Sequence, residues 1–255
     1  MNKLMTRRKL ITTGLGVAAG ASGIALAARL ASQYGLIPPD NGGVFGIGET
    51  LTYAAQRMLM SHHSLAREFS RSEISRVAPV NGDPPETEVY QRVLHSGFAD
   101  WRLTVDGLVA RPSSFTLEQL KRLPSRTQIT LHACEMGWSF IAEWTGVPLS
   151  DLLNSVGILP QARYVVLFPL DAWWESIDMS DALHPQTLLA CAMNGEQLPV
   201  PHGAPLRLRL PRQLGYKNTK YISHIKVVDT VKNIGEGVGG SNSEGKGAYS
   251  WYAGM

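Results

Sequence analysis

Short stretches in which apolar and polar residues alternate recur along the chain after residue 100. Residues 101–105 (Trp-Arg-Leu-Thr-Val) and residues 127–133 show this period of two, which is typical of a strand with one buried face. In the second stretch Ile129 and Leu131 share one side, so Cys134 is predicted to follow at the end of a strand. Further buried strands are predicted over residues 164–168, 207–210 and 221–228.

Turn and capping signals separate these strands and predict a few short helices. Residues 116–119 (Thr-Leu-Glu-Gln) have the spacing of a capping box and predict a helix that ends by Pro124. Pro148 and Gly157 stand near the start and just past the end of a second predicted helix. Asp106-Gly107 predicts a hairpin turn directly after the first strand. Short strands with few short helices together predict an α+β fold with a β-rich mixed core.

The chain divides into three predicted parts and shows no internal repeat. Residues 1–30 are predicted to be an export signal, residues 31–98 an irregular lead-in, and residues 99–255 the main domain, with the fold itself beginning near residue 75. The lead-in has the composition for one helix over residues 53–69. Adjacent side chains on a helix point apart, so the pair His62-His63 is expected to be exposed and not to bind a metal.

The first thirty residues have the pattern of a twin-arginine export signal. Arg7-Arg8 precedes a run over residues 11–28 that is rich in Gly and Ala and only weakly apolar. A membrane span usually needs about 20 strongly apolar residues. A signal cleaved near residues 25–27 and a periplasmic location are therefore expected, with an uncleaved membrane anchor as the alternative. Proteins exported by this route generally fold first, often around a cofactor.

Composition and charge narrow the class of protein further. The 255 residues suffice for one large domain or two small ones, and 44% hydrophobic with 18% charged residues is ordinary for a globular chain. The net charge of +3 is small and scattered, so nucleic acid is not an expected partner.

The chain contains two cysteines, Cys134 and Cys191. Three roles are possible for Cys134. A metal ligand ranks first, because Cys134 stands at a strand end beside Gly137 and Trp138. A disulfide with Cys191 ranks second, since exported proteins form them readily. Zinc ranks third, because no further Cys or His stands at zinc-ligand spacing. The apolar neighbours of Cys191 predict a small core residue.

Four segments resemble the molybdopterin-binding domain of the sulfite oxidase family. They are residues 132–139 (His-Ala-Cys-Glu-Met-Gly-Trp-Ser), 194–199 (Asn-Gly-Glu-Gln-Leu-Pro), 202–207 (His-Gly-Ala-Pro-Leu-Arg) and 214–217 (Leu-Gly-Tyr-Lys). The resemblance covers residues 81–252 and implies a molybdenum-dependent oxidoreductase with Mo-molybdopterin as cofactor. It also implies that Cys134 is the protein ligand to molybdenum and the catalytic residue.

The same resemblance implies a set of cofactor-binding residues. The pterin carries a phosphate, which calls for a cationic side chain and backbone amides. The residues that match those of relatives are Asn81, His202, Arg207, Asn218, Thr219 and Lys220. Not every nearby cation can point inward, so Arg209 and Arg212 are predicted to lie at the surface.

Three departures from the family pattern bear on the substrate. Glu135 stands one position earlier than the acid of many relatives, which leaves its proton-donor role open. The arginine pair that follows the cysteine in sulfite oxidases is absent, which argues against a sulfite dianion. Trp174 is a candidate for the substrate mouth, with a core position as the alternative.

The expected function is oxygen-atom transfer by two electrons on a small S- or N-oxide, with a protein sulfoxide favoured over sulfite. No haem-attachment motif C-x-x-C-H occurs, so a separate redox partner, such as a membrane cytochrome, is expected. No dimerisation domain is expected, which favours a monomer. The alternative is an exported, non-catalytic binding or scaffold module that keeps the fold.

Overall fold

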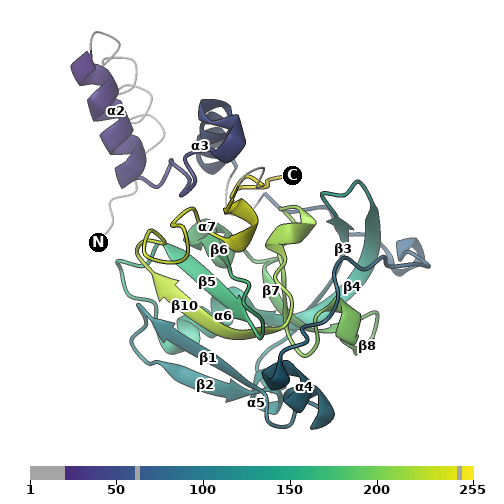
Figure 1. Cartoon of the computed structure of the whole chain (residues 1–255). Helices are drawn as coiled ribbons and strands as arrows, with labels where there is room; N and C mark the ends of the chain where they lie inside the picture. The colour runs from purple at the N-terminus through teal and green to yellow at the C-terminus, as the bar shows by residue number, and fades with distance from the viewer. Residues whose placement is uncertain (1–20, 61–63, 246–248) are drawn as a thin grey trace.

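The computed structural model describes residues 21–60, 64–245 and 249–255. The twin arginines and the pair His62-His63 lie outside these residues, so the predictions for them stay open. The described chain contains two five-stranded sheets (Figure 1). Helices and strands mix as the sequence predicts, which confirms the α+β class. No helix among the described residues has the length and apolar character needed to cross a membrane.

The first sheet has the strand order β2-β1-β10-β5-β6. Its strands are β1 (Arg102–Gly107), β2 (Ser113–Thr116), β5 (Tyr164–Pro169), β6 (Glu175–Asp178) and β10 (Ile222–Val228). β1 and β10 pair in parallel, and the other neighbours pair antiparallel. This sheet therefore joins the first and last strands of the domain side by side.

The second sheet has the order β3-β4-β7-β8, with β9 paired to β7. Its strands are β3 (Arg126–Ala133), β4 (Ser139–Pro148), β7 (Leu188–Met193), β8 (Glu196–Gln197) and β9 (Arg207–Arg209). On β3 the buried positions are the polar Gln128, Thr130 and His132, while Ile129 and Leu131 are half-buried. A buried polar face needs internal partners, and these lie beside the candidate site.

The main core packs apolar residues of both sheets around the helix α6 (Leu149–Val156). Leu149, Leu152, Leu153 and Val156 have no exposed surface, and the helix ends at Gly157, as predicted. The short helix α5 (Leu117–Lys121) begins with the predicted capping box, in which Thr116 Oγ1 accepts from the Gln119 amide at 3.0 Å.

The helix α4 (Glu88–His95) belongs to the same core although it precedes residue 99. Thr87 caps its first turn, and Tyr90 and Val93 are buried in the main cluster. The Tyr90 hydroxyl donates to the Ala204 carbonyl at 3.0 Å, next to the segment predicted to bind the cofactor.

Two expectations about elements are wrong. The strand β1 runs through Gly107 and the chain reverses later, because Gly107 (φ +86°) pairs with Val227 and a Cβ on it would meet the Val227 carbonyl. The helix expected over residues 53–69 is α3 (Ile47–Leu59), which ends ten residues earlier. Apart from it, the described part of the lead-in contains α4, the end of α2 (Ala21–Gln33) and short 3-10 turns.

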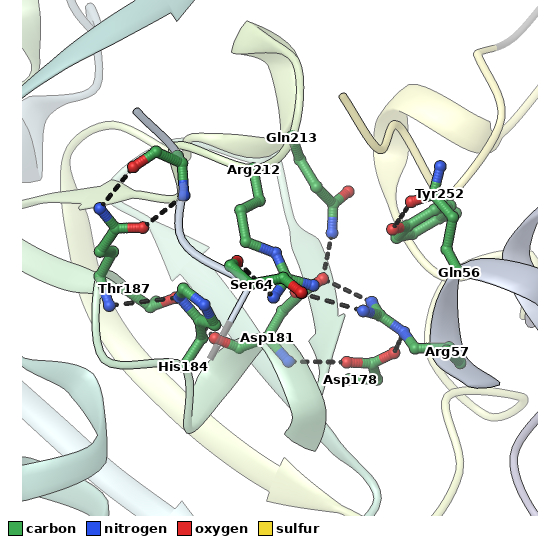
Figure 2. Close-up of polar contacts among 12 residues, drawn as sticks. Gln56, Arg57, Ser64, Asp178, Asp181, His184, Thr187, Arg212, Gln213 and Tyr252 are labelled. Atoms are coloured by element: carbon green, nitrogen blue, oxygen red, sulfur yellow. Dashed lines mark hydrogen bonds and ion pairs between the residues drawn. The ribbon is translucent and has the colours of Figure 1, made fainter. Parts of the chain in front are cut away.

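The helix α3 is attached to the domain by a buried ion cluster (Figure 2). The Arg57 guanidinium lies between two carboxylates of the α7 (Met179–Ala182) region, 2.7 Å from Asp178 Oδ2 and 2.6 Å from Asp181 Oδ2. Tyr53 donates to Asp178 at 2.8 Å, and Gln213 donates to Asp181. The cluster therefore connects the lead-in to the loop after β9.

Candidate functional site

A cavity of about 360 Å³ lies between the end of β3 and the loops that follow β5 and β9. Its wall includes every residue predicted to form the site: Asn81, Cys134, His202, Arg207, Asn218, Thr219 and Lys220. Up to 139 residues separate them along the chain, yet the Lys220 ammonium donates to the Asn81 carbonyl at 2.8 Å. The fold brings all seven together, and their contact with a cofactor stays a prediction.

Cys134 is the first residue after β3, and it is buried, with 6% of its surface exposed. A tight turn holds it: its amide donates to the Trp138 carbonyl at 2.8 Å, and the Gly137 amide donates to the Cys134 carbonyl at 3.1 Å. Burial raises the pKa of the thiol, and the adjacent Glu135 carboxylate raises it further. Metal binding must therefore displace the thiol proton, as it does at any cysteine ligand.

The loop after β9 packs directly on this strand end. A Cβ on Gly215 would lie 3.2 Å from the Ala133 carbonyl oxygen and from His132 Nε2, and 3.3 Å from Cys134 Cα. A side chain here would crowd all three atoms, so glycine favours this close approach. Gly215 therefore sets the position of the cavity wall relative to the thiol.

Asn81 and Glu135 lie next to the thiol. Asn81 Nδ2 is 3.3 Å from Glu135 Oε1 and 3.9 Å from Cys134 Sγ, and Sγ donates to Glu135 Oε2 at 3.3 Å. Both side chains line the cavity. The acid that stands one position early in the sequence thus still faces the site.

Arg207, Lys220 and His202 form a basic wall. The buried Arg207 donates to the carbonyls of His202 (2.8 Å) and Asn218 (3.3 Å), and burial lowers its pKa to about 10, so it stays charged at neutral pH. Burial and the neighbouring Arg207 lower the pKa of Lys220 to about 8. Burial, Arg207 and Lys220 lower the pKa of His202 to about 4, so this imidazole is neutral at pH 7.

Asn218 and Thr219 contribute in different ways. The Asn218 side chain is engaged by the protein: its Oδ1 accepts from Arg209 Nη1 and from the Leu210 amide, both at 2.7 Å, and its amide donates to Leu214. The Thr219 hydroxyl is buried in the cavity wall and has no partner among the described residues. Thr219 is therefore free to bind a ligand through its side chain, whereas Asn218 mainly shapes the loop.

The prediction that Arg209 and Arg212 lie at the surface is wrong. Arg209 has no exposed surface, because alternation along β9 puts it on the same face as Arg207, towards β3. There it contacts His132 Nδ1 (3.0 Å) and Thr130 Oγ1 (3.0 Å). Arg212 is buried against Asp181, with an ion pair at 3.5 Å (Figure 2).

Lys217 is also buried, but it does not line the cavity. Its ammonium pairs with Glu175 at 2.6 Å and donates to the Ser176 carbonyl at 2.8 Å. Glu175 lines the cavity, and Asn242 donates to its other oxygen at 3.1 Å. This pair is neutral overall and fixes the loop behind the basic wall.

The aromatic residue at the mouth of the cavity is Trp173 and not Trp174. Trp174 packs in a small core cluster, which is the alternative left open by the sequence, whereas Trp173 is 52% exposed and lines the cavity. Sequence reasoning also missed other members of the wall. The aromatic and histidine members among them are His132, Trp138, Phe140, Tyr216 and Tyr221.

The chemistry of this wall fits an anionic cofactor. Among the described residues, no ion pair joins Arg207, Arg209 or Lys220 to a carboxylate. Buried cations without acidic partners are costly unless an anion compensates them. The buried hydroxyls of Thr219 and Tyr221 also lack partners there. A phosphate and the polar atoms of a pterin would satisfy these groups.

The cysteine, histidine and acidic side chains show which kinds of metal site the described residues can form. Both Cys134 and Cys191 are free thiols, so the disulfide alternative is wrong. In the ranges that the structure describes, no three His, Cys, Asp or Glu side chains gather as a metal cage. An α+β domain with one buried thiol in the wall of a cationic cavity suits a protein that binds an anionic cofactor.

Comparison with known proteins identifies the class. Residues 90–234 match the family described as "Oxidoreductase molybdopterin binding domain", which is more than half of the chain. The chain belongs to this family of molybdopterin-dependent oxidoreductases, the sulfite oxidase family. It is accordingly a molybdenum-dependent enzyme with Mo-molybdopterin as its cofactor, and the non-catalytic alternative is wrong.

Several relatives share one printed activity. A "putative protein-methionine-sulfoxide reductase subunit YedZ1" of Azospira oryzae is 38% identical over 78% of this chain and 71% of its own length. The protein-methionine-sulfoxide reductase catalytic subunit MsrP of Ralstonia nicotianae is 33% identical over 51% of this chain, and its counterpart in Xanthomonas axonopodis is 34% identical over the same share. The chain spans less than half the length of these two, 44% and 45%.

A solved structure also matches. The sulfane dehydrogenase SoxCD of Paracoccus pantotrophus aligns with a TM-score of 0.49 and 29% identity, over 52% of this chain and 39% of that one.

Proposed function

We propose that this enzyme reduces methionine sulfoxide in proteins. In the balanced reaction, one sulfoxide takes up two protons and two electrons, its sulfur–oxygen bond breaks, and one thioether and one water form. The bound molybdenum cofactor supplies the redox chemistry of this oxygen-atom transfer. The observation that carries the proposal is the buried thiol of Cys134 in the wall of the cationic cavity. The names of the relatives support the substrate class.

The residues of the cavity have separate tasks in this proposal. Cys134 would hold the metal from the protein side, while Arg207, Lys220 and Thr219 would hold the anionic and polar groups of the cofactor. Glu135 is the proton carrier, because its carboxylate lies 3.3 Å from the cysteine sulfur and the reaction consumes two protons.

The charges around the opening favour a neutral substrate over sulfite. Asp83 and Asp171 are exposed members of the cavity wall, and the Glu135 carboxylate lies beside the thiol. These carboxylates repel a dianion, whereas a sulfoxide carries no net charge. The exposed ring of Trp173 offers an apolar surface for the methyl and methylene groups of a methionine side chain.

We further propose that the enzyme works in the periplasm and takes electrons from a separate membrane protein. The twin-arginine pattern at Arg7-Arg8 supports export of the folded enzyme, and no haem-attachment motif occurs in the chain.

The test uses the full chain purified from a host that makes molybdopterin. Metal analysis is expected to find about one molybdenum per chain, lost in Cys134→Ala and kept in the matched Cys191→Ala. With a reduced dye as electron donor, the enzyme is expected to reduce a peptide that contains methionine sulfoxide. Turnover of sulfite with an electron acceptor, and none of the sulfoxide peptide, would overturn the proposed substrate.

A further inference from the structure

His132 and Arg209 form a buried polar pair behind the cysteine. Arg209 has no exposed surface, and its Nη1 lies 3.0 Å from His132 Nδ1 while its Nη2 donates to the Leu131 carbonyl at 3.0 Å. No carboxylate among the described residues pairs with Arg209. Neither residue has a task in the function proposed above, although His132 lines the cavity.

The contact between them determines which ring nitrogen of His132 carries the proton. A guanidinium has only donors, so Nδ1 must accept and the ring proton must sit on Nε2. His132 Nε2 lies beside Gly215, which also approaches Cα of Cys134, and all three residues line the cavity. The Nε2–H donor therefore lies near the cysteine, on a residue of the cavity wall.

The ring is also fixed in orientation. Phe140, Trp138 and Trp144 surround it, with ring centroids 5.1, 6.2 and 6.4 Å from that of His132. The Arg209 guanidinium is held in turn by the Asn218 side chain at 2.7 Å and lies over the Trp144 ring at 4.9 Å. A preorganised donor loses little entropy when it meets an acceptor.

We propose that His132 is a further cofactor-contacting residue, which donates a hydrogen bond from Nε2 to a sulfur or oxygen acceptor of the bound cofactor, and that Arg209 is its positioning residue. The inference rests on the assignment of this cavity to the cofactor but not on the substrate. A donor near the sulfur and oxygen ligands withdraws electron density and favours the reduced metal. The pair would thus raise the reduction potential of the molybdenum.

The first test is a redox titration of the holoenzyme, followed by the electron paramagnetic resonance of the half-reduced metal. His132→Phe keeps the ring volume but removes the donor, and it is expected to keep molybdenum and shift the reduction potential downward. His132→Gln keeps a donor and is expected to restore part of that shift. A His132→Phe enzyme with the potential and spectrum of the wild type would overturn the inference.

The second test observes the tautomer directly and needs no variant of His132. In holoenzyme labelled with 15N-histidine, His132 is expected as the Nε2–H form, with the exposed His95 as an internal reference. Arg209→Met is expected to let the ring proton of His132 move to Nδ1 and to lower the reduction potential. Arg209→Lys keeps a donor to Nδ1, so it is expected to keep the Nε2–H form and the wild-type potential. An Nδ1–H form in the wild type would contradict the assignment.

The molybdenum content distinguishes a failure of the cofactor-site assignment from a failure of the role proposed for His132 and Arg209. Wild-type protein without molybdenum would refute the assignment of the cavity and with it the inference. Molybdenum-loaded protein in which neither His132→Phe nor Arg209→Met changes the potential would refute only the role of the pair.

Discussion

Glu135 is the acid nearest to the thiol of Cys134. Its carboxylate accepts from Sγ and from Asn81, both at 3.3 Å, and it lines the main cavity. It also lines a second cavity of about 410 Å³, together with Phe45 and Tyr216. A carboxyl group that borders both spaces can take up a proton on one side and release it on the other.

Replacing this acid tests the proton transfer. Glu135→Gln keeps the size of the side chain but removes its acidity, so kcat for sulfoxide reduction is expected to fall by about 100-fold or more. Molybdenum content should stay at the wild-type level. The matched control is Glu118→Gln, an exposed residue of helix α5. This variant should change neither kcat nor molybdenum content. An unchanged kcat in Glu135→Gln would remove Glu135 from the reaction.

His202 makes the stability of the apoprotein depend on pH. Its folded pKa of about 4 lies below the ordinary value of 6.5, so the unfolded chain binds more protons between these two values. Stability is therefore full above pH 6.5 and is lost as the pH falls towards 4, by about 2 kcal/mol after allowance for partial exposure. Urea unfolding at pH 7.0 and 4.5 should show a smaller loss in His202→Asn than in the wild type. Equal losses would contradict the cause given for the lowered pKa.

The sequence predicts the cavity residues by type but not the direction of each side chain. Arg207 was expected to face inward and Arg209 outward, yet residues two apart on a strand share a face. The alternation rule, applied to β9, predicts both inside. The contact between Arg209 and His132 could not be predicted, because it depends on how β9 and β3 lie in the folded sheet.

At the level of elements, α3 is a structural part of the domain through its buried ion cluster. Arg57 pairs with Asp178 and Asp181 (Figure 2). Its guanidinium also lies 5.2 Å from the Tyr53 ring centroid and 4.7 Å from that of Tyr252. Burial raises the pKa of Asp178, and Arg57 opposes this rise. Removing the cation would leave the buried Asp178 carboxylate without a cationic partner, while Asp181 would keep only its longer ion pair with Arg212.

Arg57→Met is expected to lower the free energy of unfolding by about 3 to 5 kcal/mol, because a buried charge without its partner is strongly destabilising. The matched control is Arg67→Met, whose exposed ion pair with Glu73 at 3.6 Å should contribute less than about 1 kcal/mol. Urea denaturation of both variants measures the difference. Equal stabilities would show that α3 does not depend on this cluster.

Capping residues, prolines and glycines in the sequence predict the ends of helices well, because they act on the backbone next to them. The capping box at Thr116, Pro148 before α6 and Gly157 after it all stand where predicted. The turn predicted at Gly107 is wrong, because pairing with β10 extends β1 through this glycine. That pairing joins residues more than one hundred positions apart, which no local pattern reports.

At the scale of the whole molecule, the site lies where distant segments meet. Two strand ends and the loops after β5 and β9 supply its wall, and the segment around Asn81 closes one side. The family resemblance implied these residues from their order along the chain. The cavity, the neutral pair of Lys217 and Glu175 and the mouth residue Trp173 follow only from packing.

The proposed function depends most on the bond between Cys134 and molybdenum. X-ray absorption at the molybdenum edge counts the sulfur atoms around the metal, and the wild type and Cys191→Ser are expected to show the dithiolene sulfurs plus one thiolate. Cys134→Ser protein that retains molybdenum is expected to show one sulfur fewer. An unchanged sulfur count in metal-loaded Cys134→Ser would contradict the assignment of Cys134 as the metal ligand. The loss of one sulfur in Cys191→Ser would contradict it as well.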